Sequence, residues 1–162
     1  MNLLSLTFFL LAALGSAINA AYYGEFGVAA AHKSQELSQV KFVEFGVQKP
    51  LTKSFDTRLG IGGWSDKTSY PNVRNSIYGT YQFMLQTKPV QGGMYAHYAV
   101  GPSVISHPDS LLGSHLQVCH TVGFGIADVR EVRIGLVYKH FSNAGLKRPN
   151  SGRDLVGIEV QF

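Results

Sequence analysis

The sequence predicts an all-β protein: an eight-stranded antiparallel transmembrane β-barrel that follows an N-terminal signal peptide. Three observations indicate this fold. After residue 20, stretches of about ten residues alternate between apolar and polar side chains, as in strands with two different faces. The breaks between these stretches are alternately short and long. No segment after residue 20 has the apolar stripe of a helix or a run of about 20 apolar residues that would cross a bilayer.

The length and composition fit one folded domain with few charged residues. Of the 162 residues, 15% are charged, which is below the roughly 25% of ordinary soluble domains. The single cysteine, Cys119, excludes an intramolecular disulfide and a multi-cysteine metal site. The net charge is only +4 and the basic residues are scattered, so the sequence does not indicate a nucleic-acid-binding protein.

Residues 1–20 have the pattern of a signal peptide. The apolar run from Leu3 to Leu14 is shorter than the ~20 residues of a membrane-spanning helix, and small residues ending at Ala20 follow it. No Lys or Arg precedes the run, so a short buried helix remains an alternative. We expect cleavage after Ala20, which makes residues 21–162 the barrel domain.

The predicted strands each place apolar residues on one face and polar or small residues on the other. The first alternates around Phe26 and Glu25, the second around Phe45 and Glu44, the fourth around Phe83 and Gln82, the sixth around Val122 and Thr121, and the last around Ile158 and Glu159. In the third, Gly60-Ile61-Gly62-Gly63 is interpreted as small residues in a crowded wall, because no helix follows to complete a phosphate loop. The eight strands are Tyr22–Ala31, Val40–Gln48, Ser54–Ser65, Ser76–Gln86, Gly93–Pro102, Leu116–Ala127, Val132–Phe141 and Asp154–Phe162.

The composition of the polar face favours a membrane barrel over a soluble one. It combines glycines with the charged and amide residues Glu25, Glu44, Arg58, Gln82 and Glu159, which suits the crowded polar interior of a small barrel with lipid outside. The longer breaks, near 32–39, 66–75, 103–115 and 142–153, are expected on the outer side of the membrane. A secreted soluble sandwich or lipocalin-like barrel is the alternative fold.

The six histidines do not form a recognisable metal site. None has a histidine partner at helical i, i+4 spacing or cysteines at zinc spacing, and only His107 and His115 share a predicted outer loop. We therefore expect neither a metal nor a cofactor.

One group of residues has the spacing for serine catalysis. His140 and Ser142 lie two residues apart on a predicted strand and so share a face, and Asp154 begins the neighbouring strand with the same outward parity. A hydroxyl nucleophile, an imidazole base and a carboxylate that orients the base are the parts of a serine triad. On an apolar outer face, such groups suit a substrate that is itself in the membrane. The alternative is an ordinary polar loop beside a strand end.

The stretch His140-Phe-Ser-Asn-Ala-Gly-Leu-Lys-Arg-Pro-Asn-Ser-Gly-Arg-Asp154 resembles the signature of the outer-membrane lipid A 3-O-deacylases, the PagL family. The resemblance implies an eight-stranded barrel in the bacterial outer membrane that hydrolyses the 3-O-linked hydroxyacyl chain of lipid A. It implies Ser142 as nucleophile, His140 as general base and Asp154 as the acidic member, a position where the family has Glu. Asn143 and Asn150 match Asn positions of the family motif, and the region of Asn143 and Gly145 is the candidate for oxyanion stabilisation. Lys147, Arg148 and Arg153 flank the site, where they would hold the lipid A phosphates or be ordinary solvated loop charges.

The resemblance makes lipid A or lipopolysaccharide the expected substrate and outer-membrane lipids the surroundings, with no nucleic-acid partner and a homodimer left open. Two other functions remain: a non-enzymatic structural barrel, and another lipid A-modifying barrel such as a palmitoyltransferase or a calcium-dependent deacylase.

Overall fold

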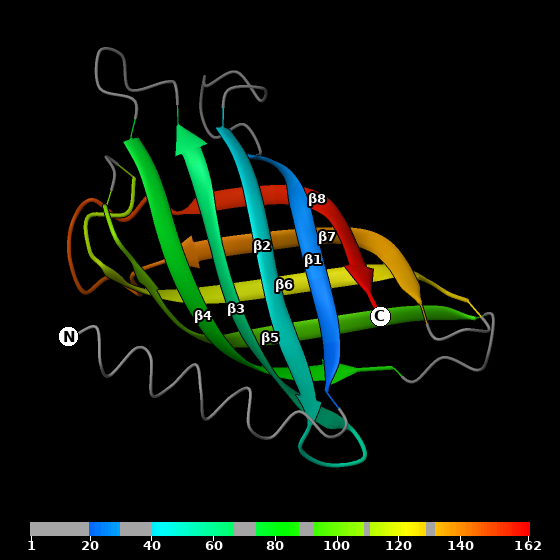
Figure 1. Cartoon of the computed structure of the whole chain (residues 1–162). Helices are drawn as coiled ribbons and strands as arrows, with labels where there is room; N and C mark the ends of the chain where they lie inside the picture. The colour runs from blue at the N-terminus through cyan, green and yellow to red at the C-terminus, as the bar shows by residue number, and fades with distance from the viewer. Residues whose placement is uncertain (1–19, 30–39, 67–73, 88–92, 109–110, 129–131) are drawn as a thin grey trace.

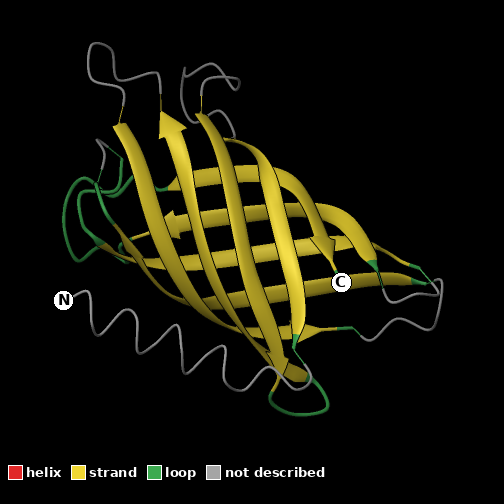
Figure 2. Ribbon diagram, viewed as in Figure 1, coloured by secondary structure: helices red, strands yellow, loops and turns green. Residues whose placement is uncertain are grey.

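The computed structural model is a closed antiparallel barrel in which each strand pairs with its neighbours in sequence and β1 pairs with β8 (Figures 1 and 2). The structure describes residues 20–29, 40–66, 74–87, 93–108, 111–128 and 132–162. The fold confirms the prediction of an eight-stranded barrel. Its strands are β1 (Ala21–Ala29), β2 (Val40–Pro50), β3 (Phe55–Asp66), β4 (Arg74–Gln86), β5 (Met94–Ile105), β6 (Leu116–Ala127), β7 (Arg133–Ser142) and β8 (Arg153–Gln161).

The predicted strand positions are close to the observed ones, and the largest difference is at β5. The sequence predicts that this strand ends at Pro102, whereas the ladder continues to Ile105, whose N–H donates to the His115 carbonyl at 2.9 Å. Proline lacks an amide, and the β4–β5 register is interrupted opposite Gly101 and Pro102 before it resumes at Ser103. Pro102 therefore interrupts the pairing with β4 without ending the strand. The last two residues of the predicted first strand and the predicted signal peptide, apart from Ala20, lie outside the described residues.

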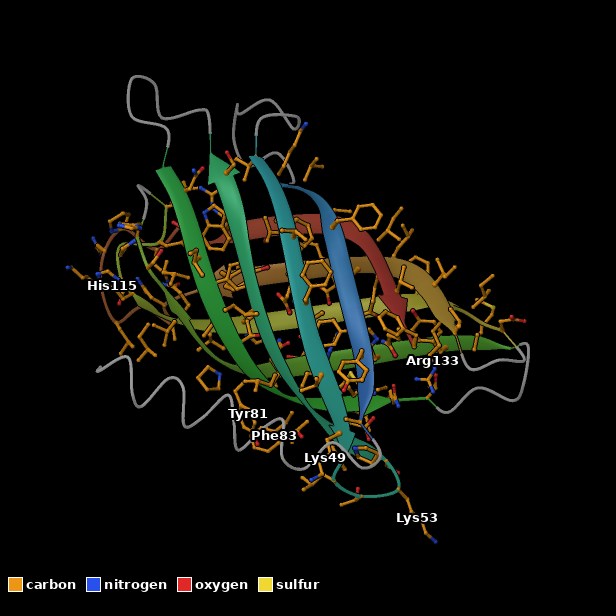
Figure 3. All side chains as sticks on the ribbon, viewed as in Figure 1. Lys49, Lys53, Tyr81, Phe83, His115 and Arg133 are labelled. Atoms are coloured by element: carbon orange, nitrogen blue, oxygen red, sulfur yellow. The ribbon has the colours of Figure 1, made fainter. Side chains whose placement is uncertain are left out.

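The barrel is apolar outside and polar inside. All eight strands contribute large apolar side chains that are exposed on the exterior, and Tyr81 and Phe83 extend outward from β4 in Figure 3. The predicted lumenal residues Glu25, Glu44, Arg58, Gln82 and Glu159 are each at most 1% exposed. This distribution is the reverse of that in a water-soluble protein and is typical of a transmembrane barrel. Within the described residues, no helix is long and apolar enough to cross a membrane.

Ion pairs fill the middle of the lumen. The Arg58 guanidinium lies 3.0 Å from a Glu25 oxygen and 2.6 Å from a Glu159 oxygen, and the Lys139 ammonium contacts Glu25 at 2.9 Å and Glu44 at 2.6 Å. Each of these charges has an opposite partner, as buried charges require. Crowding of the lumen explains why β3 carries glycines there, as predicted. A Cβ at Gly60 would lie 2.4 Å from both Glu44 Oε1 and the Tyr23 hydroxyl.

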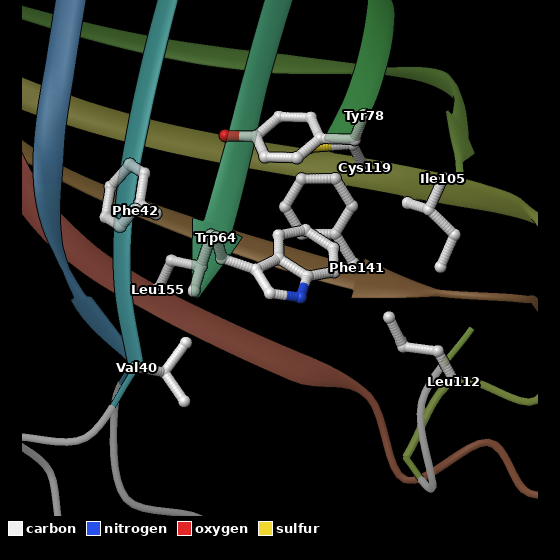
Figure 4. Close-up of a cluster of buried hydrophobic side chains, with 9 residues drawn as sticks. All are labelled: Val40, Phe42, Trp64, Tyr78, Ile105, Leu112, Cys119, Phe141 and Leu155. Atoms are coloured by element: carbon white, nitrogen blue, oxygen red, sulfur yellow. The ribbon is translucent and has the colours of Figure 1, made fainter. Parts of the chain in front are cut away.

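An apolar cluster fills the lumen toward the end where β7 runs into β8. Its central aromatic residues are Trp64, Tyr78 and Phe141, whose rings meet at centroid distances of 5.0–5.4 Å (Figure 4). Leu112, from the β5–β6 loop, is fully buried against the same cluster. The Ser151 N–H donates to the Leu111 carbonyl, so the β5–β6 and β7–β8 loops also contact each other at this end of the barrel (Figure 1). The strand ends that carry the predicted triad therefore rest on a packed interior.

Candidate active site

The three predicted catalytic residues lie on the exterior of the barrel where β7 ends and β8 begins. His140 and Asp154 face each other directly across the β7–β8 ladder, and Ser142 is two residues further along β7. The alternate side chains on these strands, Phe141, Arg153 and Leu155, are buried. The period of two in an extended strand therefore places His140, Ser142 and Asp154 on one face, as predicted.

The His140 and Asp154 side chains form a short hydrogen bond. His140 Nδ1 lies 2.6 Å from Asp154 Oδ1. Because a carboxylate accepts and does not donate, Nδ1 carries the proton, which leaves Nε2 as the basic nitrogen when the ring is neutral. Asp has one methylene less than the Glu that the resemblance implies at this position, yet its reach suffices here because the two residues are direct cross-strand neighbours.

Tyr138 supports the same carboxylate oxygen. Its hydroxyl donates to Asp154 Oδ1 at 2.7 Å from a position two residues before His140 on β7. Asp154 Oδ1 thus accepts hydrogen bonds from two residues of one strand. Tyr138 was not among the site residues predicted from the sequence. Its shared parity with His140 and Ser142 was the signal that could have identified it.

Ser142 is half-buried, and its hydroxyl makes no hydrogen bond to another described side chain, His140 included. Catalytic hydrogen bonds are often long or misaligned without substrate and shorten in the complex. Its place on the strand still puts the hydroxyl on the same face as the His140 imidazole, which is the relation that base-assisted attack requires.

A second histidine flanks the site on the opposite side from Asp154. His120 on β6 pairs directly with His140, and the centroids of their rings are 6.2 Å apart. His120 Nδ1 lies 2.7 Å from the hydroxyl of Tyr98 on β5. The polar patch on the exterior therefore extends from β5 to β8, beyond the site residues predicted from the sequence.

The predicted oxyanion residues organise the β7–β8 loop. Asn143 is fully buried, its side-chain amide donates to the backbone carbonyls of Leu112 and Lys147, and its own N–H donates to Asn150 Oδ1 at 2.8 Å. The Gly145 N–H donates to Asn143 Oδ1 at 3.1 Å. In this arrangement Asn143 and Asn150 hold the loop that follows Ser142, and an oxyanion role for Gly145 requires its N–H to exchange one acceptor for another.

The three predicted phosphate ligands are in two different environments. Lys147 and Arg148 are exposed in the β7–β8 loop. Arg153 is only 3% exposed, and its guanidinium lies 5.4 Å from the centre of the Trp64 ring inside the barrel. The structure therefore places Lys147 and Arg148 on the surface of the loop that follows Ser142, whereas Arg153 belongs to the interior. The loop histidine His115 lies at the same end of the barrel, with Nδ1 2.9 Å from the Ile105 carbonyl (Figure 3).

The arrangement has the parts needed for acyl transfer through a serine. It offers a hydroxyl, an imidazole whose Nε2 makes no hydrogen bond to a described residue, and a carboxylate that fixes the imidazole tautomer. Among the described residues, no group of three or more His, Cys, Asp and Glu side chains is placed to hold a metal ion.

Comparisons with known proteins bear on the family and the fold of the chain. A sequence profile described as "Lipid A 3-O-deacylase (PagL)" matches residues 16–162. The curated "Lipid A deacylase PagL" of Bordetella bronchiseptica is 42% identical over 71 residues, a segment that covers 42% of this chain and 40% of that protein, well under two thirds of its length. A solved structure described as "Crystal structure of the outer membrane enzyme PagL" matches with a TM-score of 0.65 at 18% identity, over 88% of this chain and 98% of that one. At this identity, the structural match supports the barrel fold.

Proposed function

Since the chain belongs to the lipid A 3-O-deacylase (PagL) family, we propose that it removes the 3-O-linked hydroxyacyl chain of lipid A in the outer leaflet of the bacterial outer membrane. The observation that carries the proposal is the 2.6 Å contact between His140 and Asp154 on the apolar exterior, with Ser142 on the same face. A polar site on such a surface is costly unless its substrate lies in the membrane. An acylated lipid meets this condition.

The proposed reaction is hydrolysis through an acyl-enzyme. His140 Nε2 takes the Ser142 proton as the serine oxygen attacks the ester carbonyl, and Asp154 stabilises the imidazolium that forms. The tetrahedral intermediate collapses, the sugar oxygen leaves, and His140 returns the proton to it. His140 then activates a water molecule, which attacks the acyl-serine and releases a 3-hydroxy fatty acid together with free Ser142. Every proton moves through His140, and the residues need no metal or organic cofactor for these steps.

Binding of the lipid headgroup is proposed to involve the exposed loop after Ser142. Lys147 and Arg148 would contact the lipid A phosphates, since charge-assisted hydrogen bonds to phosphate are among the stronger polar contacts. The Gly145 N–H is the candidate donor to the oxyanion, in place of its present bond to Asn143. Asn143 and Asn150 would act by holding this loop in position.

Mass spectrometry of lipid A from cells that express the protein tests this function. We expect the loss of one hydroxyacyl chain relative to cells that carry an empty vector. A gain of palmitate would identify a transferase, and unchanged lipid A would identify a structural barrel; either result would reject the proposal.

The same assay in detergent micelles, with and without EDTA, separates this mechanism from a calcium-dependent one. We expect equal rates, because the proposed chemistry uses only side chains. Micelles are required because chelation also perturbs cation-bridged lipopolysaccharide in membranes. Activity that EDTA abolishes and calcium restores would contradict the mechanism.

A further inference from the structure

The backbone of Gly152 lies directly against the His140 imidazole. Gly152 is buried, immediately precedes β8 and has a φ angle of +78°. A Cβ at this position would lie 2.6 Å from His140 Cε1, 3.3 Å from Nε2 and 3.4 Å from Nδ1. The three nearest atoms all belong to one ring, so any side chain at position 152 would compete with the imidazole for the same space.

We propose that Gly152 is a positioning residue: the absence of its side chain allows the His140 ring to lie where Nδ1 reaches Asp154 and Nε2 is left to serve Ser142. The inference rests on the proposed function, because it assigns Gly152 a role through the catalytic base. Gly152 is two residues before Asp154, so one short segment supplies both the carboxylate that holds the ring and the open space that the ring occupies.

The ring has little freedom to move away from an added methyl group. On the β8 side, the 2.6 Å bond to Asp154 holds Nδ1, and Tyr138 holds the same carboxylate oxygen. On the β6 side, His120 lies with its ring centroid 6.2 Å away. Relief of a 2.6 Å contact requires the ring, or the backbone at 152, to shift by a substantial fraction of an ångström. Misplacement of a catalytic group by about 1 Å can cost on the order of 10²-fold in rate.

A second glycine in the same loop separates crowding from backbone conformation. Gly145 has a φ angle of +81°, close to that of Gly152, yet a Cβ there would meet nothing within 4 Å. An L-residue at either position carries the cost of the left-handed region. Only a residue at 152 would also contact His140. Gly145→Ala therefore measures the conformational cost alone, and it is used here as a stability reference.

The test is a double-mutant cycle on the full-length barrel. Gly152→Ala is made in the wild-type and in the His140→Ala background, and unfolding in urea and the kinetics of lipid A deacylation in micelles are measured for all four proteins. In the wild-type background we expect kcat to fall by about 10- to 100-fold with KM changed less than about threefold. We also expect a larger loss of stability than Gly145→Ala causes.

Removal of the His140 ring should abolish the specific effect. In the His140→Ala background, Gly152→Ala should cost no more stability than Gly145→Ala and should lower the residual rate no further. If Gly152→Ala alone does not fold, the double variant should fold, since the clashing ring is gone.

Three results would overturn the positioning role: an unchanged kcat in Gly152→Ala, the same loss of stability with and without the His140 ring, or a double variant that also fails to fold. A wild-type protein that leaves lipid A intact would instead reject the proposed function, and the unfolding cycle would still report on the contact between Gly152 and His140. The two failures are therefore distinguishable.

Discussion

Among the described residues, two histidine–carboxylate pairs lie on opposite sides of the barrel wall. On the exterior, His140 Nδ1 contacts Asp154 Oδ1 at 2.6 Å, with side chains that are 34% and 21% exposed. In the lumen, His97 Nδ1 lies 3.7 Å from Glu159 Oε1, and both side chains are fully buried. The same two chemical groups thus occur in an accessible setting and in an inaccessible one.

The partners of each histidine explain the different roles. His97 Nε2 accepts from the Arg58 guanidinium at 3.3 Å, and Arg58 also binds Glu159, so both ring nitrogens of His97 face protein groups. His140 uses only Nδ1 for its carboxylate, and a serine follows two residues later on the same face. Exterior and lumenal positions alternate along one strand, so the parity of a residue decides whether such a pair can meet a lipid.

The largest expected effect is at the nucleophile. Ser142→Ala should lower the deacylation rate by about 10⁴- to 10⁶-fold, the range for loss of a triad serine, while the barrel still folds and keeps its heat-modifiable mobility in gels. Ser103→Ala is the matched lumenal control, because Ser103 is 1% exposed and inward-facing. It should keep near-wild-type activity. A folded Ser142→Ala protein with a near-normal rate would contradict the assignment of Ser142 as the nucleophile.

The next effect is at the exterior carboxylate. Asp154→Asn cannot stabilise an imidazolium and no longer fixes the tautomer of His140, so the rate should fall on the order of 10³- to 10⁴-fold with stability nearly unchanged. Asp154→Glu restores the family's usual residue and should retain measurable activity. Wild-type kinetics in Asp154→Asn beside an inactive Ser142→Ala would mean a dyad, or an acidic member elsewhere.

The lumenal carboxylate should behave in the opposite way. Glu159→Gln leaves the Arg58 guanidinium with one charged partner fewer in a fully buried site. Breaking a buried ion pair from one side costs about 3–5 kcal/mol, so the free energy of unfolding should fall by that order. The rate per folded molecule should stay within a few-fold of wild type. If the folded fraction lost as much rate as Asp154→Asn does, the assignment of catalysis to the exterior pair and of stability to the lumenal pair would be contradicted.

The exterior face itself can be tested away from the site. Ile158→Arg places a charge on the apolar outside of β8 and should destabilise the barrel by about 2–4 kcal/mol in a refolding titration. Ile158→Leu is the control and should change stability little. Gly157 is unsuitable as a lumenal comparison, because a Cβ there would lie 2.3 Å from the Phe26 carbonyl oxygen. Tolerance of arginine at 158 would contradict the assignment of this face to lipid.

The smallest effect is expected for Tyr138→Phe, which removes the hydrogen bond from the Tyr138 hydroxyl to Asp154 Oδ1. A bond of this kind contributes about 0.5–1.5 kcal/mol, so kcat should fall by roughly two- to tenfold. Tyr81→Phe, on the exterior of β4, loses the same hydroxyl elsewhere on the surface and should leave kcat unchanged. Equal kinetics for the two variants would show that the Tyr138 contact does not orient Asp154 during catalysis.

The sequence predicted most of the fold because the relevant physics is local. In a barrel wall, each residue faces either lipid or lumen, so alternation around Glu25, Glu44 and Glu159 identified both the strands and their inner faces. Pro102 was misleading, because a missing amide weakens one rung of a ladder without determining where the strand ends. The pairing of Arg58 and Lys139 with particular glutamates depends on barrel closure and could not be predicted from any one strand.

The site was predictable where it depends on parity. His140, Ser142 and Asp154 follow from alternation and from antiparallel pairing of neighbouring strands. Alternation along a strand does not reveal the contacts that loop residues make, or those that reach the site from β5 and β6. Asn143 is buried where its amide binds the Leu112 carbonyl, Arg153 lies inward over Trp64, and the Gly152 backbone lies against the His140 ring. No pattern of alternation encodes those contacts.

Covalent labelling of the folded barrel with a long-chain alkyl fluorophosphonate tests most directly whether the exterior group is the catalytic centre. The reagent reacts with a serine only when a neighbouring base activates it, and its chain suits an apolar surface. Peptide mass spectrometry should find the adduct on Ser142, with labelling greatly slowed in Asp154→Asn and unchanged in the folded fraction of Glu159→Gln. A protein that deacylates lipid A while Ser142 stays unlabelled, or that carries the adduct on another serine, would contradict the account.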